Sequence, residues 1–186
     1  MPIDAKDRIV DRYHPAAADN AAERRFVKLA SSTEKEPEVG SAQRAPTRNP
    51  GLKPLERLVG TWKVSGDTTG QLKYEWMEGR FFLLAQGDTE QGGRRTRHIE
   101  IIGYEHDAGA DPSTVMTSRL YTDSGDTLSY THEVDEEGVT SWFGAKGSPA
   151  VFKARWIDDD TLAGAWEWPG GGYKLTLSRV KERSAT

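Results

Sequence analysis

The chain has 186 residues, a net charge of −4 at pH 7 and no cysteine. The lack of cysteine excludes disulfides, thiolate metal sites and a cysteine nucleophile. Residues 51–186 carry a net charge of −5 and therefore lack the basic surface that nucleic acids or anionic membranes attract, so we expect neither partner.

The N-terminal 50 residues differ from the rest of the chain. They hold only two of the 17 aromatic residues, Tyr13 and Phe26, and residues 31–50 form a polar, proline-containing linker. We predict a disordered or partly helical tail over 1–50, a folded domain over 51–182 and a short C-terminal tail over 183–186. A helix around Phe26 that docks on the domain or on a partner is the alternative for the tail.

No secretory or membrane segment is evident. Residues 1–8 are charged and have no apolar core of a signal peptide. No apolar run approaches the roughly 18–20 residues of a membrane span. We therefore expect a cytoplasmic protein.

The domain begins with a short helix and a glycine–tryptophan pair. Leu52, Leu55 and Leu58 recur at every third residue, which predicts one or two helical turns with an apolar face. Gly60 would permit close approach of another backbone, and Trp62 would plug the end of a barrel. We expect Gly60, Trp62 and Val64 on the inner face of the first strand.

Strand-like segments then recur every 8–12 residues with turn residues between them, and no helical pattern interrupts them. This predicts an all-β fold, a single antiparallel up-and-down β-barrel of about ten strands with the short helix closing one end. Closure hides the strand edges and leaves room for one small ligand. The expected strands are 59–65, 71–77, one that starts at Arg80, and then 94–104, 114–122, 127–134, 139–143, 150–157, 161–168 and 173–180.

Alternation assigns faces around the predicted two-residue turn Glu78-Gly79. Phe82 and Leu84 would point outward, where two large apolar side chains need a cover: the N-terminal tail or a second copy in a homodimer. A polar loop is expected over 87–93. The inward residues would be Leu72, Tyr74, Trp76, Phe81, Leu83 and Ala85.

Four segments together resemble a bacterial family of lipocalin-like domains of unknown function in the calycin group. They are Leu58-Val59-Gly60-Thr61-Trp62, residues 74–83 (YEWMEGRFFL), residues 99–104 (IEIIGY) and residues 162–168 (LAGAWEW). The resemblance spans Leu52 to Val180 and implies a barrel closed at one end with a small-molecule pocket. The chain is also similar, more distantly, to nitrobindin-like barrels, which bind haem through a histidine near the C-terminus. Here the last histidine is His132, so we expect no haem and predict no cofactor.

Three side chains are candidates for acid–base chemistry. His98 and Glu100 alternate with Ile102 and Tyr104, and the register of this strand is open, so either face can be inward. If they are inward, an apolar cavity would raise the pKa of the carboxyl and suit it to act as a general base. His132 shares a face with Leu128, Tyr130 and Val134, and we expect it inward.

No other motif indicates catalysis. No serine stands in a nucleophile-elbow context, and the eight-residue spacing of His98 and His106 is weak as a metal site. Asp158-Asp159-Asp160 is typical of a turn. We therefore predict no metal site.

The interpretation that we favour is a small-molecule-binding protein with a hydrophobic or aromatic ligand in the barrel. The reason is that the domain has more aromatic residues than are needed to close the ends of a small barrel, so some of them would line a cavity. One alternative is a barrel-pocket enzyme of the isomerase or cyclase type that uses the histidine and glutamate candidates. The other is a structural or dimerisation module whose aromatics simply fill the barrel. The expected ligand-binding residues are Trp62, Tyr74, Trp76, Phe81, Leu83, Tyr104, Tyr130, His132, Trp142 and Trp166.

Overall fold

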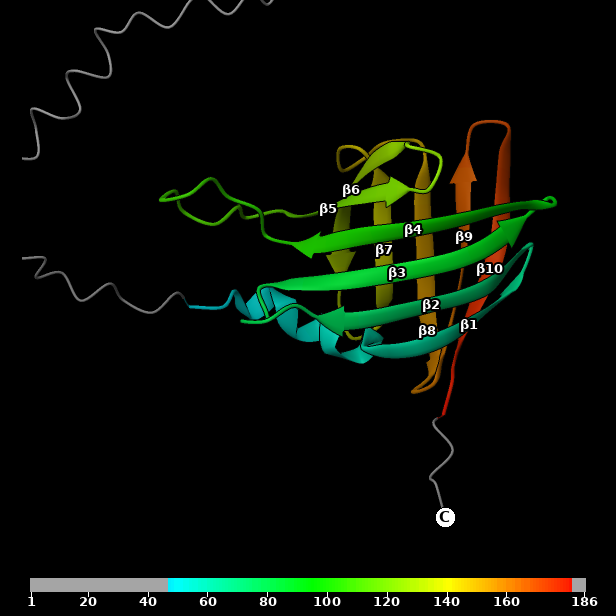
Figure 1. Cartoon of the computed structure of the whole chain (residues 1–186), viewed down its shortest axis with the longest axis horizontal. Helices are drawn as coiled ribbons and strands as arrows, with labels where there is room; N and C mark the ends of the chain where they lie inside the picture. Colours follow the sequence, from blue (N-terminus) through cyan, green and yellow to red (C-terminus); the bar gives the residue numbers. More distant parts are fainter. Residues whose placement is uncertain (1–46, 182–186) are drawn as a thin grey trace, which may run out of the picture. The chain divides into compact units, whose positions relative to one another are not determined.

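The computed structural model describes residues 47–181. The predicted tails, 1–50 and 183–186, lie outside the described residues apart from 47–50. One helix precedes ten strands (Figure 1). The elements are η2 (Pro50–Leu58), β1 (Gly60–Gly66), β2 (Thr68–Trp76), β3 (Phe82–Gln91), β4 (Arg94–Gly103), β5 (Met116–Thr122), β6 (Thr127–Val134), β7 (Gly138–Phe143), β8 (Val151–Asp158), β9 (Thr161–Trp168) and β10 (Gly171–Arg179).

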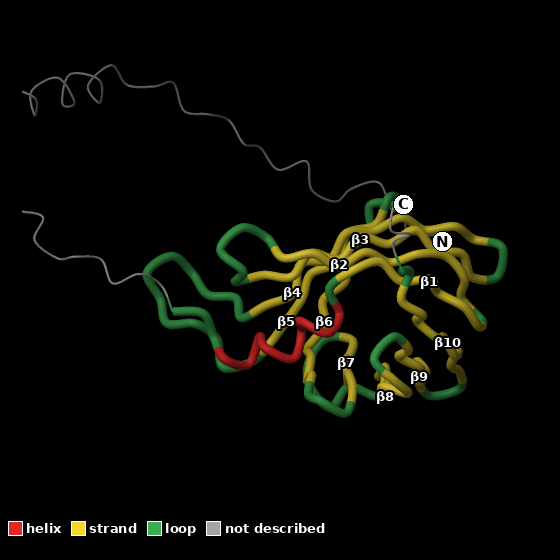
Figure 2. The backbone as a smooth tube through the Cα atoms, turned by 90° about the horizontal axis from the view of Figure 1, so that it is seen from below, coloured by secondary structure: helices red, strands yellow, loops and turns green. Residues whose placement is uncertain are grey.

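The ten strands close into an antiparallel barrel. Each strand pairs with the next along the chain, and β1 pairs with β10 to close the ring that Figure 2 shows. This confirms the predicted all-β, up-and-down, ten-stranded barrel with one short helix. Within residues 47–181 no helix has the length and the apolar character that crossing a membrane requires.

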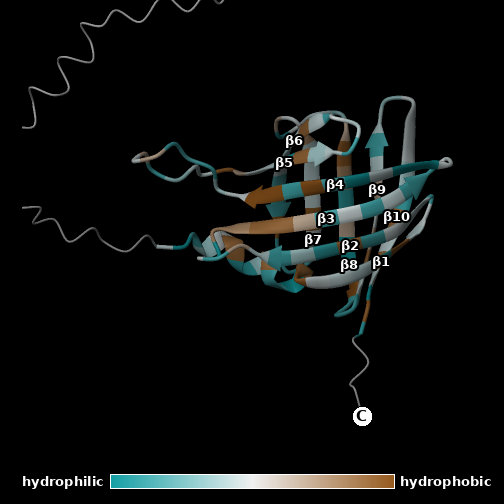
Figure 3. Ribbon diagram, in the orientation of Figure 1, coloured by the Kyte–Doolittle hydropathy of each residue, from teal (hydrophilic) through white to brown (hydrophobic). Residues whose placement is uncertain are grey.

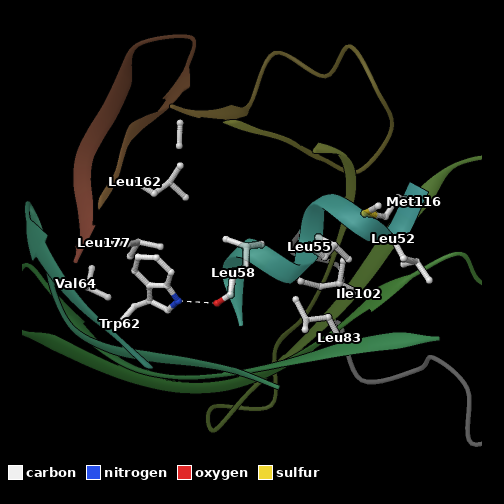
Figure 4. Close-up of a cluster of buried hydrophobic side chains, with 11 residues drawn as sticks. Leu52, Leu55, Leu58, Trp62, Val64, Leu83, Ile102, Met116, Leu162 and Leu177 are labelled. Atoms are coloured by element: carbon white, nitrogen blue, oxygen red, sulfur yellow. Dashed lines mark hydrogen bonds between the residues drawn. The ribbon is translucent and has the colours of Figure 1, made fainter. Parts of the chain in front are cut away.

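The helix η2 is a 3-10 helix, and its leucine spacing explains how it packs. A 3-10 helix has 3.0 residues per turn, so Leu52, Leu55 and Leu58 lie in one line along it. Asn49 accepts a hydrogen bond from the Gly51 N–H at 2.9 Å and caps the start of the helix. All three leucines are buried, in a cluster with residues that include Leu83, Ile102 and Met116 (Figure 4). The helix therefore closes one end of the barrel, as predicted.

Trp62 on β1 and Arg179 on β10 connect the first and last strands of the barrel to the helix. Trp62 is 0% exposed, and its indole N–H donates to the Leu58 carbonyl at 2.7 Å (Figure 4). The Arg179 guanidinium lies 4.2 Å from the centre of the Trp62 ring and donates to the carbonyls of Arg57 and Val59. At Gly60, φ is 124° and a Cβ would lie 2.9 Å from Arg179 Nη1. The positive φ is what requires glycine here, and the group nearest to a Cβ would be the guanidinium and not another backbone as expected.

Two connections differ from the prediction. The turn after β2 is longer than two residues: Trp76 pairs with Leu83 and Met77 N–H donates to the Phe82 carbonyl, which leaves Phe81 in the turn. The polar segment 87–93 is not a loop, because β3 continues to Gln91. Only Gly92 and Gly93 turn the chain, with φ of 56° and 78°, the positive values of a type I′ hairpin.

The outer face of β3 and β4 carries apolar residues. Phe82 and Leu84 alternate with the buried Leu83 and Ala85 and point outward as predicted. Leu84 pairs with Ile101, and the next outward residue of β4, Ile99, is 47% exposed. A homodimer through this face remains a prediction.

Truncating the helix should destabilise the barrel. In Leu55→Ala, the lost contacts and the cavity left behind should lower the free energy of unfolding by about 2–5 kcal/mol. Lys53 lies on the exposed side of the same helix, so Lys53→Ala should change it by no more than about 0.5 kcal/mol. Urea unfolding monitored by tryptophan fluorescence measures both. Equal stability of the two variants would contradict the role assigned to η2.

Candidate functional site

A partly open cavity of about 220 Å³ occupies the barrel interior. It extends from Leu55 and Leu58 on the helix to Thr68, Thr89 and Tyr173, near the ends of β2, β3 and β10 that lie away from the helix. Figure 3 shows the matching gradient along β3 and β4, whose most hydrophobic stretches lie toward the helix end. The other lining residues are Val64, Leu72, Tyr74, His98, Glu100, Ile102, Leu120, Tyr130, His132, Val134, Val139, Ser141, Phe152, Leu162, Trp166, Leu175 and Leu177.

The register of the β3–β4 hairpin places His98 and Glu100 in this cavity. The Gly92-Gly93 turn pairs Gln91 with Arg94, and continuing the ladder pairs Gly87 with His98 and Ala85 with Glu100. Ala85 is 0% exposed and inward, so its partner Glu100 is inward as well. The His98 imidazole lies over Gly87, where a Cβ would overlap it. The inward alternative for this pair is therefore the correct one.

Four side chains from consecutive strands form a chain of hydrogen bonds in the cavity wall. Ser118 Oγ on β5 donates to Glu100 Oε1 on β4 at 2.5 Å. A hydroxyl has one proton, so Ser118 accepts its second bond from His132 Nε2 on β6, at 2.7 Å. The neutral imidazole then has no proton on Nδ1, which accepts from Ser141 Oγ on β7 at 2.8 Å. His132 is thus held as the Nε2–H tautomer.

The cavity disfavours charge on its titratable groups. Burial lowers the pKa of His132 to about 4. Burial also raises the pKa of Glu100, against a smaller opposing effect of the Ser118 hydrogen bond. The pKa of His98 is lowered by burial and raised less by Asp123. At pH 7 both imidazoles are neutral, so no histidine supplies a positive charge to the cavity.

Aromatic rings form one wall. Trp166 on β9 lies 5.7 Å from Tyr130 and 5.6 Å from Phe152, centre to centre, in tilted arrangements. Tyr173 pairs with Trp166 across the β9–β10 ladder, and burial raises its pKa to about 12. These rings give the site flat apolar surfaces, while Glu100 and the histidines supply a few polar groups.

No family model matches this sequence, and no curated protein is significantly similar to it. What the site does must therefore be argued from its geometry.

The structure brings together part of the predicted set. All three acid–base candidates, His98, Glu100 and His132, line the cavity. Of the predicted ligand-binding residues, Tyr74, Tyr130, His132 and Trp166 line it as well.

The other predicted binding residues lie outside the cavity lining. Trp62 and Leu83 are 0% exposed in the packed core at the helix end. Trp76 donates to Glu56 Oε2 at 3.0 Å, and Tyr104 packs against that core with its hydroxyl against Gly51. Phe81 lies in the turn after β2.

Trp142 is a predicted ligand-binding residue that does not face the cavity. It alternates with Ser141, which faces the cavity and binds His132, so Trp142 points to the outer face. There Lys146 Nζ lies 5.7 Å from its ring centre.

Several site residues were not predicted. Ser118 and Ser141 are polar residues at inward positions among apolar neighbours. This break in the polar–apolar alternation is the sequence feature that could indicate them as site residues. Thr68 is 8% exposed and lines the cavity, and its Oγ1 is the only buried side-chain N or O atom among residues 47–181 without a hydrogen-bond partner. Buried hydroxyls without a partner are rare in folded proteins. Within the described residues no group of three or more His, Asp or Glu side chains could hold a metal ion.

Acid should destabilise the fold through His132. Its pKa is near 6.5 when unfolded and about 4 when folded, so at pH 5 the unfolded chain binds a proton that the folded chain does not. Between pH 7 and pH 5 this should cost about 2 kcal/mol of unfolding free energy. Glu100, which faces His132, acts in the opposite direction because its pKa is raised, and Tyr130 does not titrate in this range.

Variants isolate this contribution. His132→Gln should lose about 2 kcal/mol less than the wild type between the two pH values, as measured by urea unfolding. His106 is exposed in a loop, so His106→Gln should lose as much as the wild type. Equal losses in the wild type and His132→Gln would show that His132 titrates normally in the folded protein.

Proposed function

We propose that this protein binds a small aromatic or apolar molecule in the barrel cavity. The observation that carries the proposal is the cavity itself, with mostly apolar and aromatic walls and a few convergent polar groups. A barrel that only needed to be stable would be expected to fill this space with side chains, because packed interiors hold few voids larger than a water molecule.

The size of the cavity limits the ligand. Drug-sized ligands occupy pockets of about 300–1,000 Å³, whereas this cavity is about 220 Å³. An apolar cavity of about 150 Å³ accommodates benzene. A single aromatic ring with a short substituent therefore fits within the cavity.

Tryptophan fluorescence can test binding because Trp166 lines the cavity. We expect at least one compound from a panel of monocyclic aromatics, small metabolites and fatty acids to give saturable quenching and a raised melting temperature. Trp166→Phe should lose most of the quenching. Trp142 lies on the outer face, so Trp142→Phe should retain it. A panel that yields neither quenching nor a thermal shift would refute the proposal.

A second candidate, acid–base catalysis on the bound molecule, is favoured by the hydrogen-bonded chain from Glu100 to Ser141. A carboxylate with a raised pKa can take a proton from a carbon next to a carbonyl group and return it to another carbon of the same molecule. Such an isomerisation needs no other reactant. His132 and Ser118 would orient the carboxylate.

Deuterium exchange tests this candidate. Phenylacetone in heavy water should exchange the protons next to its carbonyl faster with the protein than in buffer alone, as followed by proton NMR. Glu100→Gln should abolish the acceleration, whereas Glu167→Gln, on the exposed outer side of β9, should not. Exchange at the buffer rate with the wild-type protein would remove this candidate.

A further inference from the structure

The charges that line the cavity are unbalanced. Of its lining residues in the described part of the chain, Glu100 is the only acidic one, and none is lysine or arginine. The Glu100 side chain is only 14% exposed. A carboxylate removed from water to this degree costs free energy unless a cation or several hydrogen-bond donors compensate it.

The neighbouring groups compensate it incompletely. Among the side-chain hydrogen bonds of the described residues, the Glu100 carboxyl takes part in one, from Ser118. His132 Nε2 lies 3.7 Å from Glu100 Oε1, but the imidazole is neutral and directs its proton to Ser118 at 2.7 Å. The carboxylate therefore keeps unused acceptor capacity next to the cavity.

The rings around Glu100 favour the same kind of partner. The Glu100 charge is close enough to Tyr74 and Tyr130 to contribute to raising the pKa of both phenols. Trp166 lies 5.7 Å from Tyr130 on the same wall. A cation beside Glu100 would thus also lie near electron-rich ring faces, which attract cations by about 0.5–2 kcal/mol.

We propose that the ligand is a protonated monocyclic aromatic amine whose ammonium group pairs with Glu100 at the bottom of the cavity. This inference rests on the proposed binding function and adds the chemical class of the ligand. Register places Glu100 two residues from the core residue Ile102, while Thr68 and Thr89 lie toward the other end. The ammonium would lie beside Glu100, and the ring would lie against Tyr130 and Trp166.

An ammonium–Glu100 pair also implies that a carboxylate ligand of similar size binds poorly in the cavity. A carboxylate ligand would place a like charge beside Glu100, so one of the two would have to take up a proton. A neutral alcohol would donate one hydrogen bond to Glu100 but would leave the charge uncompensated. The expected order of affinity is therefore amine, then alcohol, then carboxylate.

Three probes of nearly equal size test this order: phenethylamine, phenethyl alcohol and phenylacetate. Isothermal titration of the full-length chain at pH 7 should show the amine binding at least about tenfold more tightly than the alcohol, and phenylacetate weakest. In Glu100→Gln, amine affinity should fall at least about tenfold while alcohol affinity stays within about twofold. Glu167→Gln, on the outer face, should preserve the wild-type order.

The outcomes separate this inference from the function on which it rests. Alcohol or phenylacetate binding as tightly as the amine would overturn the amine assignment and leave a binding protein. The same holds if none of the three binds while other members of the fluorescence panel do. If no compound of either set binds, both proposals fail. The ranking with the wild-type chain decides the matter even if Glu100→Gln does not fold.

Discussion

The barrel depends on how Arg179 and Trp62 seal one end. Carbonyl groups at the end of a helix lack partners within the helix. Here the Leu58 carbonyl is bound by the Trp62 indole, and those of Arg57 and Val59 are bound by the Arg179 guanidinium. Because Arg179 ends β10 and Trp62 lies on β1, the same contacts hold the first and last strands together. The sealed end leaves the opposite end as the place where the cavity can open.

Much of this architecture could be predicted from local periodicity. The three-residue leucine spacing in η2 and the two-residue alternation around Trp62, Leu83 and Ala85 identified the closing helix and the inward faces. The face of β4 does not follow from the sequence, because the polar composition of residues 87–93 indicates a loop and leaves the strand register after it open. A Gly-Gly turn with both φ values positive pairs Gln91 with Arg94, and this one pairing decides that Glu100 is inward.

The candidate site was predictable only in part, because alternation gives the face of a residue and not its depth. Trp62, Leu83 and Trp76 belong to the inner face of their strands but lie at the helix end, where side chains fill the barrel. The depth of a side chain along the barrel depends on the stagger between strands and on where η2 packs. Neither can be inferred from the sequence of a single strand. The prediction for Trp142 rests on aromatic composition alone, and its neighbour Ser141 has the inward position.

The two ends of the barrel interior therefore have different physical tasks. At the helix end, apolar packing and satisfied carbonyls stabilise the fold. Toward the other end, burial of Glu100 and His132 opposes stability, since apolar residues of similar volume in place of buried polar pairs are often neutral or stabilising. Sites that bind ligands commonly keep such costly groups, because a ligand can complete the interactions that the protein leaves open. A cation that pairs with Glu100 would offset part of this cost on binding, so ligand affinity and the destabilisation by the buried carboxylate would have the same origin.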